Sequence, residues 1–211
     1  MPDSLHWFRN SAEYRALTLQ TYRLAAQTLE RRVSGKARNA WAVILDADET
    51  VLDNSQYFKE RSVLGQKFSR PTWHEWTQRK TAGSVPGAAD FLKRVQELGG
   101  RIAIVTNRAA SECPDTEVNF KANGLPFDVI LCNADLGNSS KQGRFAQVAK
   151  GATPAGLPPL DVVMWMGDNV LDFPGMNQDA RLRPERLKEF GERFFVLPNP
   201  TYGSWEGSPR Q

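Results

Sequence analysis

The sequence has no apolar run that approaches the roughly 20 residues required to span a membrane. Its first segment, MPDSLHWFRNSAEYRAL, also lacks the basic, apolar and small-residue order of a signal peptide. Lys and Arg number 27 against 24 for Asp and Glu, and a net charge of +3 is too small to predict a nucleic-acid polymer as partner. We therefore expect either a cytoplasmic chain or a mature form from which an export signal was removed.

Cysteine and histidine are both scarce. Cys113 and Cys132 match no zinc motif, and neither is followed six residues later by Arg, which excludes a cysteine-based phosphatase loop. We expect ordinary half-buried thiols. The alternative is a disulfide, because both cysteines follow neighbouring strands, and it would imply an oxidising compartment. His6 and His74 are too few and too badly placed for histidine-phosphatase or alkaline-phosphatase chemistry.

Apolar strands alternate with helical segments along most of the 211 residues. The expected strands are residues 41–45, 101–106, 129–131, 162–166 and 194–197. The expected helices are residues 10–32, 86–98, 115–123, 140–150 and 184–190. Continuous apolar strands that alternate with helices predict an α/β fold with a doubly wound parallel sheet covered on both faces.

A small helical cap is expected beside this core. Residues 54–85 carry no strand signal, and a capping-box pattern of Thr72 with Glu75 predicts a short helix there. A second such pattern, Asn10 with Glu13, predicts the start of the first helix. We expect one unit over residues 1–211, with the core at 40–53 and 86–200, the cap at 10–34 and 54–85, and a loop-like tail at 198–211.

Polar residues follow four successive strands. They are Asp46 and Asp48 after the first strand, Thr106 after the second, Lys141 at some distance beyond the third, and Asp168 and Asp172 after the fourth. Singly, each residue has an ordinary structural explanation, but the fold places them together on one edge of the sheet. Two carboxylates at the end of a buried strand repel each other, and a divalent cation would offset this. The set supplies a nucleophile, a hydroxyl, a cation and an acidic cluster, as phosphoryl transfer requires.

The order DxDxT, Thr, Lys, GDNxxD resembles that of the haloacid dehalogenase superfamily. The longer forms VILDADETVLDNSQY and MGDNVLDF resemble the class C (DDDD) bacterial acid phosphatases, including the outer-membrane lipoprotein e type of 5′-nucleotidase. The resemblance continues through RPTWHEW, VPGAADF, VTNR and LPNPTYGSWEG and covers most of the chain. It implies a Rossmann-like core and a Mg²⁺-dependent phosphoric monoester hydrolase acting on nucleoside 5′-monophosphates and related small esters.

The resemblance also implies roles for the acidic residues. Asp46 would be the nucleophile that forms an aspartyl-phosphate. Asp48 would protonate the leaving alkoxide and then deprotonate the attacking water. Mg²⁺ would be held by the carboxylates of Asp46 and Asp168 and the main-chain carbonyl of Asp48, with Asp172 supporting the metal through a water.

Phosphate and substrate contacts are implied in the same way. Thr106, Asn107 and Lys141 would bind the phosphate oxygens, and Lys141 would offset the crowding of negative charge. Trp73 and Tyr202 would stack on the base of a nucleotide. The alternative for these two aromatic residues is structural: Trp73 would anchor the cap helix and Tyr202 would pack the tail.

Three further questions stay open at this point. A phosphotransferase would use the same phospho-Asp, and a non-catalytic binding or storage protein on this fold would be expected to lose the nucleophile, which is present here as Asp46. The resembled proteins are exported, often with a lipid anchor, so we expect the periplasm or outer membrane, with membrane contact only through an anchor that this sequence does not show. A homodimer is compatible with the sequence.

Overall fold

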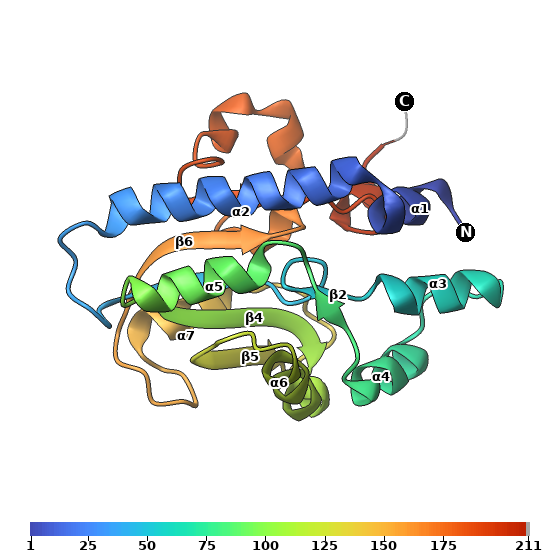
Figure 1. Ribbon diagram of the computed structural model, residues 1–211, viewed down its shortest axis with the longest axis horizontal. Helices are drawn as coiled ribbons and strands as arrows, with labels where there is room; N and C mark the ends of the chain where they lie inside the picture. The colour runs from blue at the N-terminus through green and yellow to red at the C-terminus, as the bar shows by residue number, and fades with distance from the viewer. Residues whose placement is uncertain (210–211) are drawn as a thin grey trace.

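The computed structural model describes residues 1–209 and has an α/β fold built around one five-stranded sheet (Figure 1). The strands are β1 (Trp41–Leu45), β4 (Arg101–Ala109), β5 (Val129–Asn133), β6 (Asp161–Gly167) and β7 (Phe194–Val196). They lie in the order β5-β4-β1-β6-β7, and every neighbouring pair is parallel. The predicted parallel sheet is confirmed, and the carboxyl ends of its strands share one edge.

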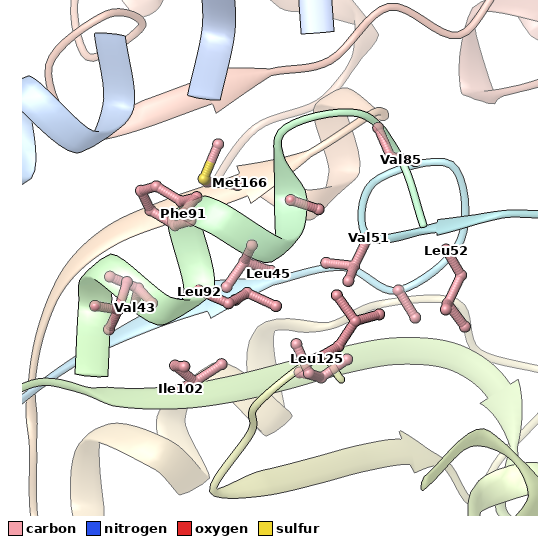
Figure 2. Packing of buried hydrophobic residues seen from close by; sticks show 14 of the residues in the cluster. Val43, Leu45, Val51, Leu52, Val85, Phe91, Leu92, Ile102, Leu125 and Met166 are labelled. Carbon is pink, nitrogen blue, oxygen red and sulfur yellow. The ribbon is translucent and has the colours of Figure 1, made fainter. Parts of the chain in front are cut away.

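Helices cover both faces of this sheet. They are α2 (Ala12–Val33), α5 (Ala88–Glu97) and α6 (Cys113–Ala122) on one face and α7 (Gln142–Lys150) on the other. Successive side chains of β1 point to opposite faces. Val43 and Leu45 therefore pack near Phe91 of α5 (Figure 2), whereas Ile44 belongs to the second cluster, with Phe145 of α7. Burial on both faces explains why the strands are continuously apolar.

The N-terminal segment forms two helices where we expected one. The first is α1 (Asp3–Asn10), and α2 follows it directly. The predicted capping box of Asn10 and Glu13 is wrong by one residue. Ser11 has an extended backbone, and its Oγ accepts a hydrogen bond from the Tyr14 backbone N–H at 3.0 Å, which makes Ser11 the N-cap of α2.

The placement of α2 also differs from the expectation. We expected residues 10–34 to belong to the cap, but α2 lies along the sheet beside α5 (Figure 1). The apolar stripe of α2 contains Tyr22, Ala25 and Leu29 at helical spacing. It belongs to the same buried cluster as Val43 and Leu45 of β1. This apolar stripe needs the sheet as its partner. The division of the rest of the chain into core and cap stays a prediction.

A smaller unit lies beyond the carboxyl ends of the strands (Figure 1). Its elements are β2 (Leu52–Asp53), α3 (Ser55–Val63), α4 (Arg70–Arg79) and β3 (Gly83–Ser84). The two short strands pair antiparallel in a region where we expected none, since two residues leave no periodic signal. The predicted cap at Thr72 is also wrong, because Ser69 accepts the hydrogen bond from Thr72 N–H at 3.4 Å. Pro71 then suits the first turn of α4.

The C-terminal part contains less helix than expected. Residues 184–190 were predicted as a helix, but only 3₁₀ turns form, at Gln178–Leu182 and Pro184–Leu187. The second of these turns buries no side chain, so it has no buried apolar face to stabilise a longer helix. The predicted tail is a loop with a 3₁₀ turn at Ser204–Gly207, and its residues 210 and 211 lie outside the described residues. Within residues 1–209, no helix has the length and apolarity that a membrane crossing needs.

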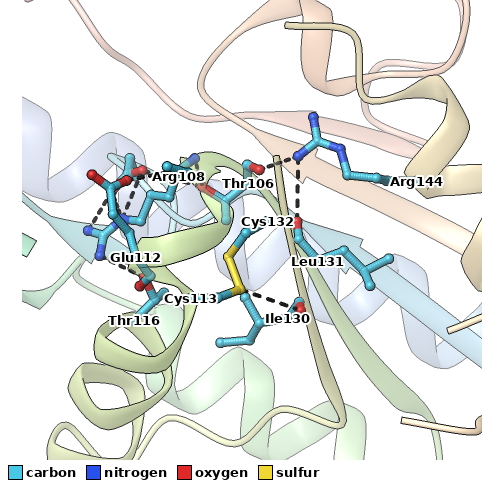
Figure 3. Close-up of a disulfide and its surroundings, with 11 residues drawn as sticks. Thr106, Arg108, Glu112, Cys113, Thr116, Ile130, Leu131, Cys132 and Arg144 are labelled. Atoms are coloured by element: carbon cyan, nitrogen blue, oxygen red, sulfur yellow. Dashed lines mark hydrogen bonds and ion pairs between the residues drawn. A yellow bond between two sulfur atoms is a disulfide. The ribbon is translucent and has the colours of Figure 1, made fainter. Parts of the chain in front are cut away.

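The two cysteines form a disulfide between α6 and β5 (Figure 3). The expectation of free thiols is therefore wrong, and the alternative holds. Cys113 is the first residue of α6 and Cys132 lies near the end of β5, with their Cα atoms 5.9 Å apart. The neighbouring strands β4 and β5 bring the two residues together, as the alternative assumed.

Candidate active site

One pocket of about 380 Å³ opens at the carboxyl ends of the strands. Its polar side is formed by Asp46, Asp48, Asn107, Arg108, Lys141, Asp168, Asn169 and Asp172. Its apolar side is formed by Phe58, Phe68, Trp73, Leu171 and Tyr202, with Arg70 and Glu206 also in the lining. We call Asp46, Asp48, Asp168 and Asp172 the carboxylate rim. We call Phe58, Phe68, Trp73 and Tyr202 the aromatic wall.

Three members of the carboxylate rim form a tight cluster. One carboxylate oxygen each of Asp46, Asp168 and Asp172 lies within 4.8 Å of the others. The Lys141 ammonium donates to Asp46 Oδ1 at 2.5 Å and to Asp172 Oδ1 at 2.6 Å. Asp168 accepts hydrogen bonds from Thr50 Oγ1 at 3.1 Å and from Asn199 Nδ2 at 2.8 Å. The structure thus brings these predicted site residues together at one edge of the sheet, and their roles stay predictions.

Burial makes the negative charge of this cluster unfavourable. It raises the pKa of Asp46 to about 7, although Lys141 acts in the opposite direction. Burial likewise raises the pKa of Asp168 well above its usual value, and Asp172 adds to the rise. Burial alone would lower the pKa of Lys141, but Asp172 and Asp46 outweigh it and raise it. A single lysine leaves the cluster negative, and an oxygen-only donor set fits a hard divalent cation such as Mg²⁺.

A tight turn after β1 carries two of the rim residues into the pocket. Val51 N–H donates to the Ala47 carbonyl at 2.9 Å, and Glu49 N–H donates to the Leu52 carbonyl at 2.8 Å. Glu49 adopts a left-handed backbone with φ of 54°. The turn therefore reverses within a few residues and presents the side chains of positions 46 and 48 on the same side of the sheet edge.

Close packing also fixes the end of β6. A Cβ atom added at Gly167 would lie 2.3 Å from Asp172 Cβ, so only glycine leaves room for that carboxylate. Asp172 Oδ2 then accepts the Asn169 backbone N–H at 2.9 Å. The GDN sequence after the strand thus serves to bring Asp172 back over the strand end.

Asp48 is held by an arginine that the sequence reasoning did not single out. Arg108 donates to Asp48 Oδ1 from Nη2 at 2.7 Å and from Nε at 3.0 Å. Asn54 Nδ2 adds a third hydrogen bond to the same oxygen at 2.9 Å. The contacts to Asp48 Oδ2 are longer, 3.2 Å from Arg108 and 3.5 Å from Thr106. Oδ2 is therefore the oxygen left freer for proton exchange.

Thr106 and Asn107 occupy different positions relative to the pocket. Thr106 is fully buried beside Asp48, its Oγ1 accepts the Arg108 backbone N–H at 3.1 Å, and it is not part of the lining. Asn107 lines the pocket, but its side chain already bonds Arg144 at 2.6 Å and the Ser139 carbonyl at 3.0 Å. Their roles as phosphate ligands stay predictions.

The aromatic wall brings both predicted stacking residues to the pocket. Trp73 is 6% exposed and packs edge-on against Tyr57 with ring centres 5.1 Å apart, so it both anchors the cap helix and lines the pocket. Phe58 lies 5.1 Å from Tyr202 and Phe68 lies 5.9 Å from Trp73, between ring centres. The sequence reasoning missed Phe58 and Phe68, because nothing in their spacing distinguishes them from core residues.

A buried glutamate connects the wall to the rim and was also missed. Tyr202 donates its hydroxyl to Glu49, and Glu49 Oε1 accepts the Asn54 backbone N–H at 2.9 Å. Burial and the nearby Asp48 raise the pKa of Glu49 to about 8. The only available signal was its place in the DADET segment, where an acidic residue next to two others is easily taken for a solvated turn.

A parallel α/β core with an acidic cluster and a buried lysine at its strand ends, beside a small helical unit, is the arrangement of the haloacid dehalogenase (HAD) superfamily. The family model described as HAD superfamily, subfamily IIIB (Acid phosphatase), matches residues 1–205. The chain belongs to this family.

Known proteins agree with this assignment. The crystal structure of the class C acid phosphatase from Bacillus anthracis with tungstate bound superposes with a TM-score of 0.84 and 29% identity, over 97% of this chain and 85% of that one. Two Glycine max proteins, the stem 28 kDa and 31 kDa glycoproteins, are each 24% identical, over 75% and 74% of this chain. The chain spans 58% and 50% of the length of these two curated relatives.

Proposed function

We propose that this protein is a metal-dependent phosphomonoesterase that works through an aspartyl-phosphate on Asp46. The observation that carries the proposal is the cluster of Asp46, Asp168 and Asp172 with Lys141 bonded to two of them, in the lining of one pocket. The similar Bacillus anthracis structure contains tungstate, a tetrahedral oxyanion like phosphate. These are the elements that phosphoryl transfer needs: a carboxylate nucleophile, a fixed cation and an acidic metal site.

The reaction follows from the positions of Asp46 and Asp48. The Asp46 carboxylate attacks phosphorus, the bond to the ester oxygen breaks, and Asp48 gives that oxygen a proton from Oδ2. Asp48, now ionised, takes a proton from a water molecule that attacks the same phosphorus. The acyl-phosphate bond breaks, inorganic phosphate leaves, and both carboxyl groups return to their starting states.

The metal proposed for this site is Mg²⁺. It would be held by the carboxylates of Asp46 and Asp168 and the main-chain carbonyl of Asp48, with Asp172 at the edge of the site. A bound divalent cation would supply positive charge between the carboxylates and the phosphoryl oxygens. Lys141 bonds the carboxylates of Asp46 and Asp172, so both cations would share the charge that the incoming phosphate adds.

The proposed substrates are small esters with a planar leaving group, nucleoside 5′-monophosphates among them. The aromatic wall lines the same pocket as the carboxylate rim, so a ring on the leaving group would contact it while the phosphate reaches Asp46. Stacking of a base on an aromatic side chain contributes about 1–3 kcal/mol and tolerates different bases. This favours nucleotides over sugar phosphates without selecting one base.

We also propose an exported protein that works in the periplasm or at the outer membrane. The disulfide between Cys113 and Cys132 supports this, because disulfides persist in oxidising compartments and are rare in the cytosol. Membrane contact through a lipid anchor and a homodimeric state are proposed only by resemblance. Fractionation of native cells, with detection of the chain in the periplasmic or membrane fraction, tests the location.

A phosphate-release screen tests the activity. The substrates are nucleoside 5′-monophosphates, nicotinamide mononucleotide, p-nitrophenyl phosphate and sugar phosphates, each assayed with EDTA and then with added Mg²⁺. We expect hydrolysis that EDTA abolishes and Mg²⁺ restores, with nucleotides ahead of sugar phosphates. No release from any ester under these conditions would contradict the proposal. Transfer of phosphate to an added alcohol, in place of release, would favour the phosphotransferase.

A further inference from the structure

Arg144 is a buried arginine behind the pocket that the proposed mechanism does not use. It lies in the first turn of α7 and is 9% exposed. Its Nη1 donates to the Thr106 carbonyl and to the Leu131 carbonyl, the latter at 3.5 Å (Figure 3). Its Nη2 donates to Asn107 Oδ1 at 2.6 Å and to the Ser140 carbonyl at 3.2 Å. Both nitrogens at the end of the guanidinium are therefore occupied.

All four of these acceptors are neutral. A buried arginine is ordinarily paired with a carboxylate, because removing its charge from water is expensive. Within residues 1–209, no Asp or Glu lies within ion-pair distance of Arg144. Burial lowers the pKa of Arg144, and the more distant Asp46 and Asp172 act against that change. A guanidinium remains charged in such surroundings, so its positive charge is left without a direct partner.

The groups that Arg144 holds are those next to the proposed phosphate ligands. Thr106 and Asn107 lie in the last part of β4, whereas Ser140 immediately precedes Lys141, the N-cap residue of α7. These segments are far apart in the sequence, and one guanidinium bonds to both. It therefore fixes the distance between the last part of β4 and the lysine.

We propose that Arg144 is the positioning residue of the phosphate-binding side of the pocket: it holds Thr106, Asn107 and the segment before Lys141 in register, and the bound phosphate dianion balances its charge. This inference rests on the proposed phosphatase function. Arg144 does not touch the substrate. It acts through Asn107 and Lys141, which line the pocket, through the buried Thr106 beside them, and through the positive potential that it adds.

A purely structural arginine offers the matched control. Arg101 lies at the opposite end of β4 and donates to Asp128 at 2.6 Å, so its charge already has a partner. Arg101→Gln should lower the melting temperature and leave phosphate binding unchanged. Arg144→Gln should weaken phosphate binding, because the neutral amide cannot supply the charge or reach all four acceptors.

The experiment measures inorganic phosphate as a competitive inhibitor of p-nitrophenyl phosphate hydrolysis, and its direct binding by calorimetry in the presence of Mg²⁺. For Arg144→Gln we expect the inhibition constant to rise about tenfold to hundredfold, the loss of one hydrogen-bonded charge. Mg²⁺ binding measured by calorimetry without phosphate should stay at the wild-type value. Arg144→Lys keeps the charge but loses the paired donors of the guanidinium. Its inhibition constant for phosphate should lie between those of the wild type and Arg144→Gln.

Three results would overturn the inference. An unchanged phosphate constant in Arg144→Gln would make the residue structural only, and so would a parallel loss of Mg²⁺ binding. If Arg144→Gln does not fold, Arg144→Lys is measured in its place. An inhibition constant for phosphate equal to that of the wild type would then show that Arg144 is structural only. Failure of the wild-type protein itself to bind phosphate or release it from any ester would instead contradict the proposed function.

Discussion

The two sides of the pocket are built in opposite ways. The carboxylate rim comes from the ends of adjacent strands and the turns that follow them, so the hydrogen bonds of the sheet determine where its members lie. The aromatic wall comes from α3, α4, the segment between them and the C-terminal tail. These parts meet through ring contacts and a few side-chain bonds, among them those of Tyr57 with Thr72 and of Tyr202 with Glu49. We therefore expect changes in the rim to abolish the reaction for every substrate, and changes in the wall to alter which substrate is preferred.

The largest effect is expected from Asp46→Asn. The amide cannot form the acyl-phosphate, so turnover should fall by about 10⁵-fold or more, the scale of losing a catalytic nucleophile. The fold should persist, because burial already disfavours the charge on Asp46. Phosphate release and thermal unfolding check the two halves of this prediction. Asp161→Asn, an exposed change at the opposite end of β6, is the control and should keep full activity. Turnover near wild type in Asp46→Asn would refute the assigned nucleophile.

This contrast also explains what could be predicted from the sequence. Asp46, Lys141 and Asp168 could be placed together because each follows a strand, and strand order alone decides which edge they share. Arg108 could not, although it stands two residues after Thr106. Its role depends on reaching Asp48, which is 60 residues away along the chain. No local pattern encodes such a distance.

The wall shows the same limit more strongly. Trp73 and Tyr202 were predicted as pocket residues only through resemblance, and Phe58 and Phe68 were not predicted at all. An aromatic residue in a helix has the same sequence signature whether it packs in a core or lines a pocket. The disulfide was undecided for a related reason, since it depends on the position of Cys113 relative to β5 and not on the spacing of the two cysteines.

Removal of the disulfide should affect the aromatic wall more than the carboxylate rim. Cys113→Ser with Cys132→Ser should lower the free energy of unfolding by about 3 kcal/mol, as for a closed loop of this size. The bond anchors α6, and Asn119 of α6 bonds Ala82, just after α4, at 2.8 Å. The Michaelis constant for nucleotides should therefore rise more than the turnover number falls.

Denaturant unfolding measures the first quantity and steady-state kinetics the second. Reduction of the wild-type protein with dithiothreitol should reproduce the double substitution, and it should leave the double variant itself unchanged. An unfolding free energy equal to that of the wild type would show that the disulfide adds nothing, and an equal fall in turnover for all esters would place its effect on the rim.

Metal and pH together should probe the rim without any substitution. The folded pKa of Asp46, about 7, lies above its ordinary value of 3.8. Stability from this group is therefore fully present below about pH 4 and is lost as the pH rises through 7. In EDTA the melting temperature should fall over that range. Mg²⁺ favours the ionised carboxylates, so the rise in melting temperature that it causes should grow with pH, with Na⁺ at equal ionic strength as control. A metal effect independent of pH would argue against this cluster as the binding site.

The smallest effect is expected in the wall itself. Trp73→Leu should lower kcat/KM for nucleoside 5′-monophosphates about tenfold, which is about 1.4 kcal/mol and lies within the range for stacking of a base, and leave glycerol phosphate nearly unchanged. Trp73→Phe should recover most of the loss, since it keeps an aromatic face. Trp76→Phe is the matched control: Trp76 is buried on the same helix, bonds Asn54 at 2.9 Å and does not line the pocket. Trp76→Phe should lower stability and keep the ratio of kcat/KM between nucleotides and glycerol phosphate. An equal loss of kcat/KM for both substrates in Trp73→Leu would show that Trp73 is purely structural.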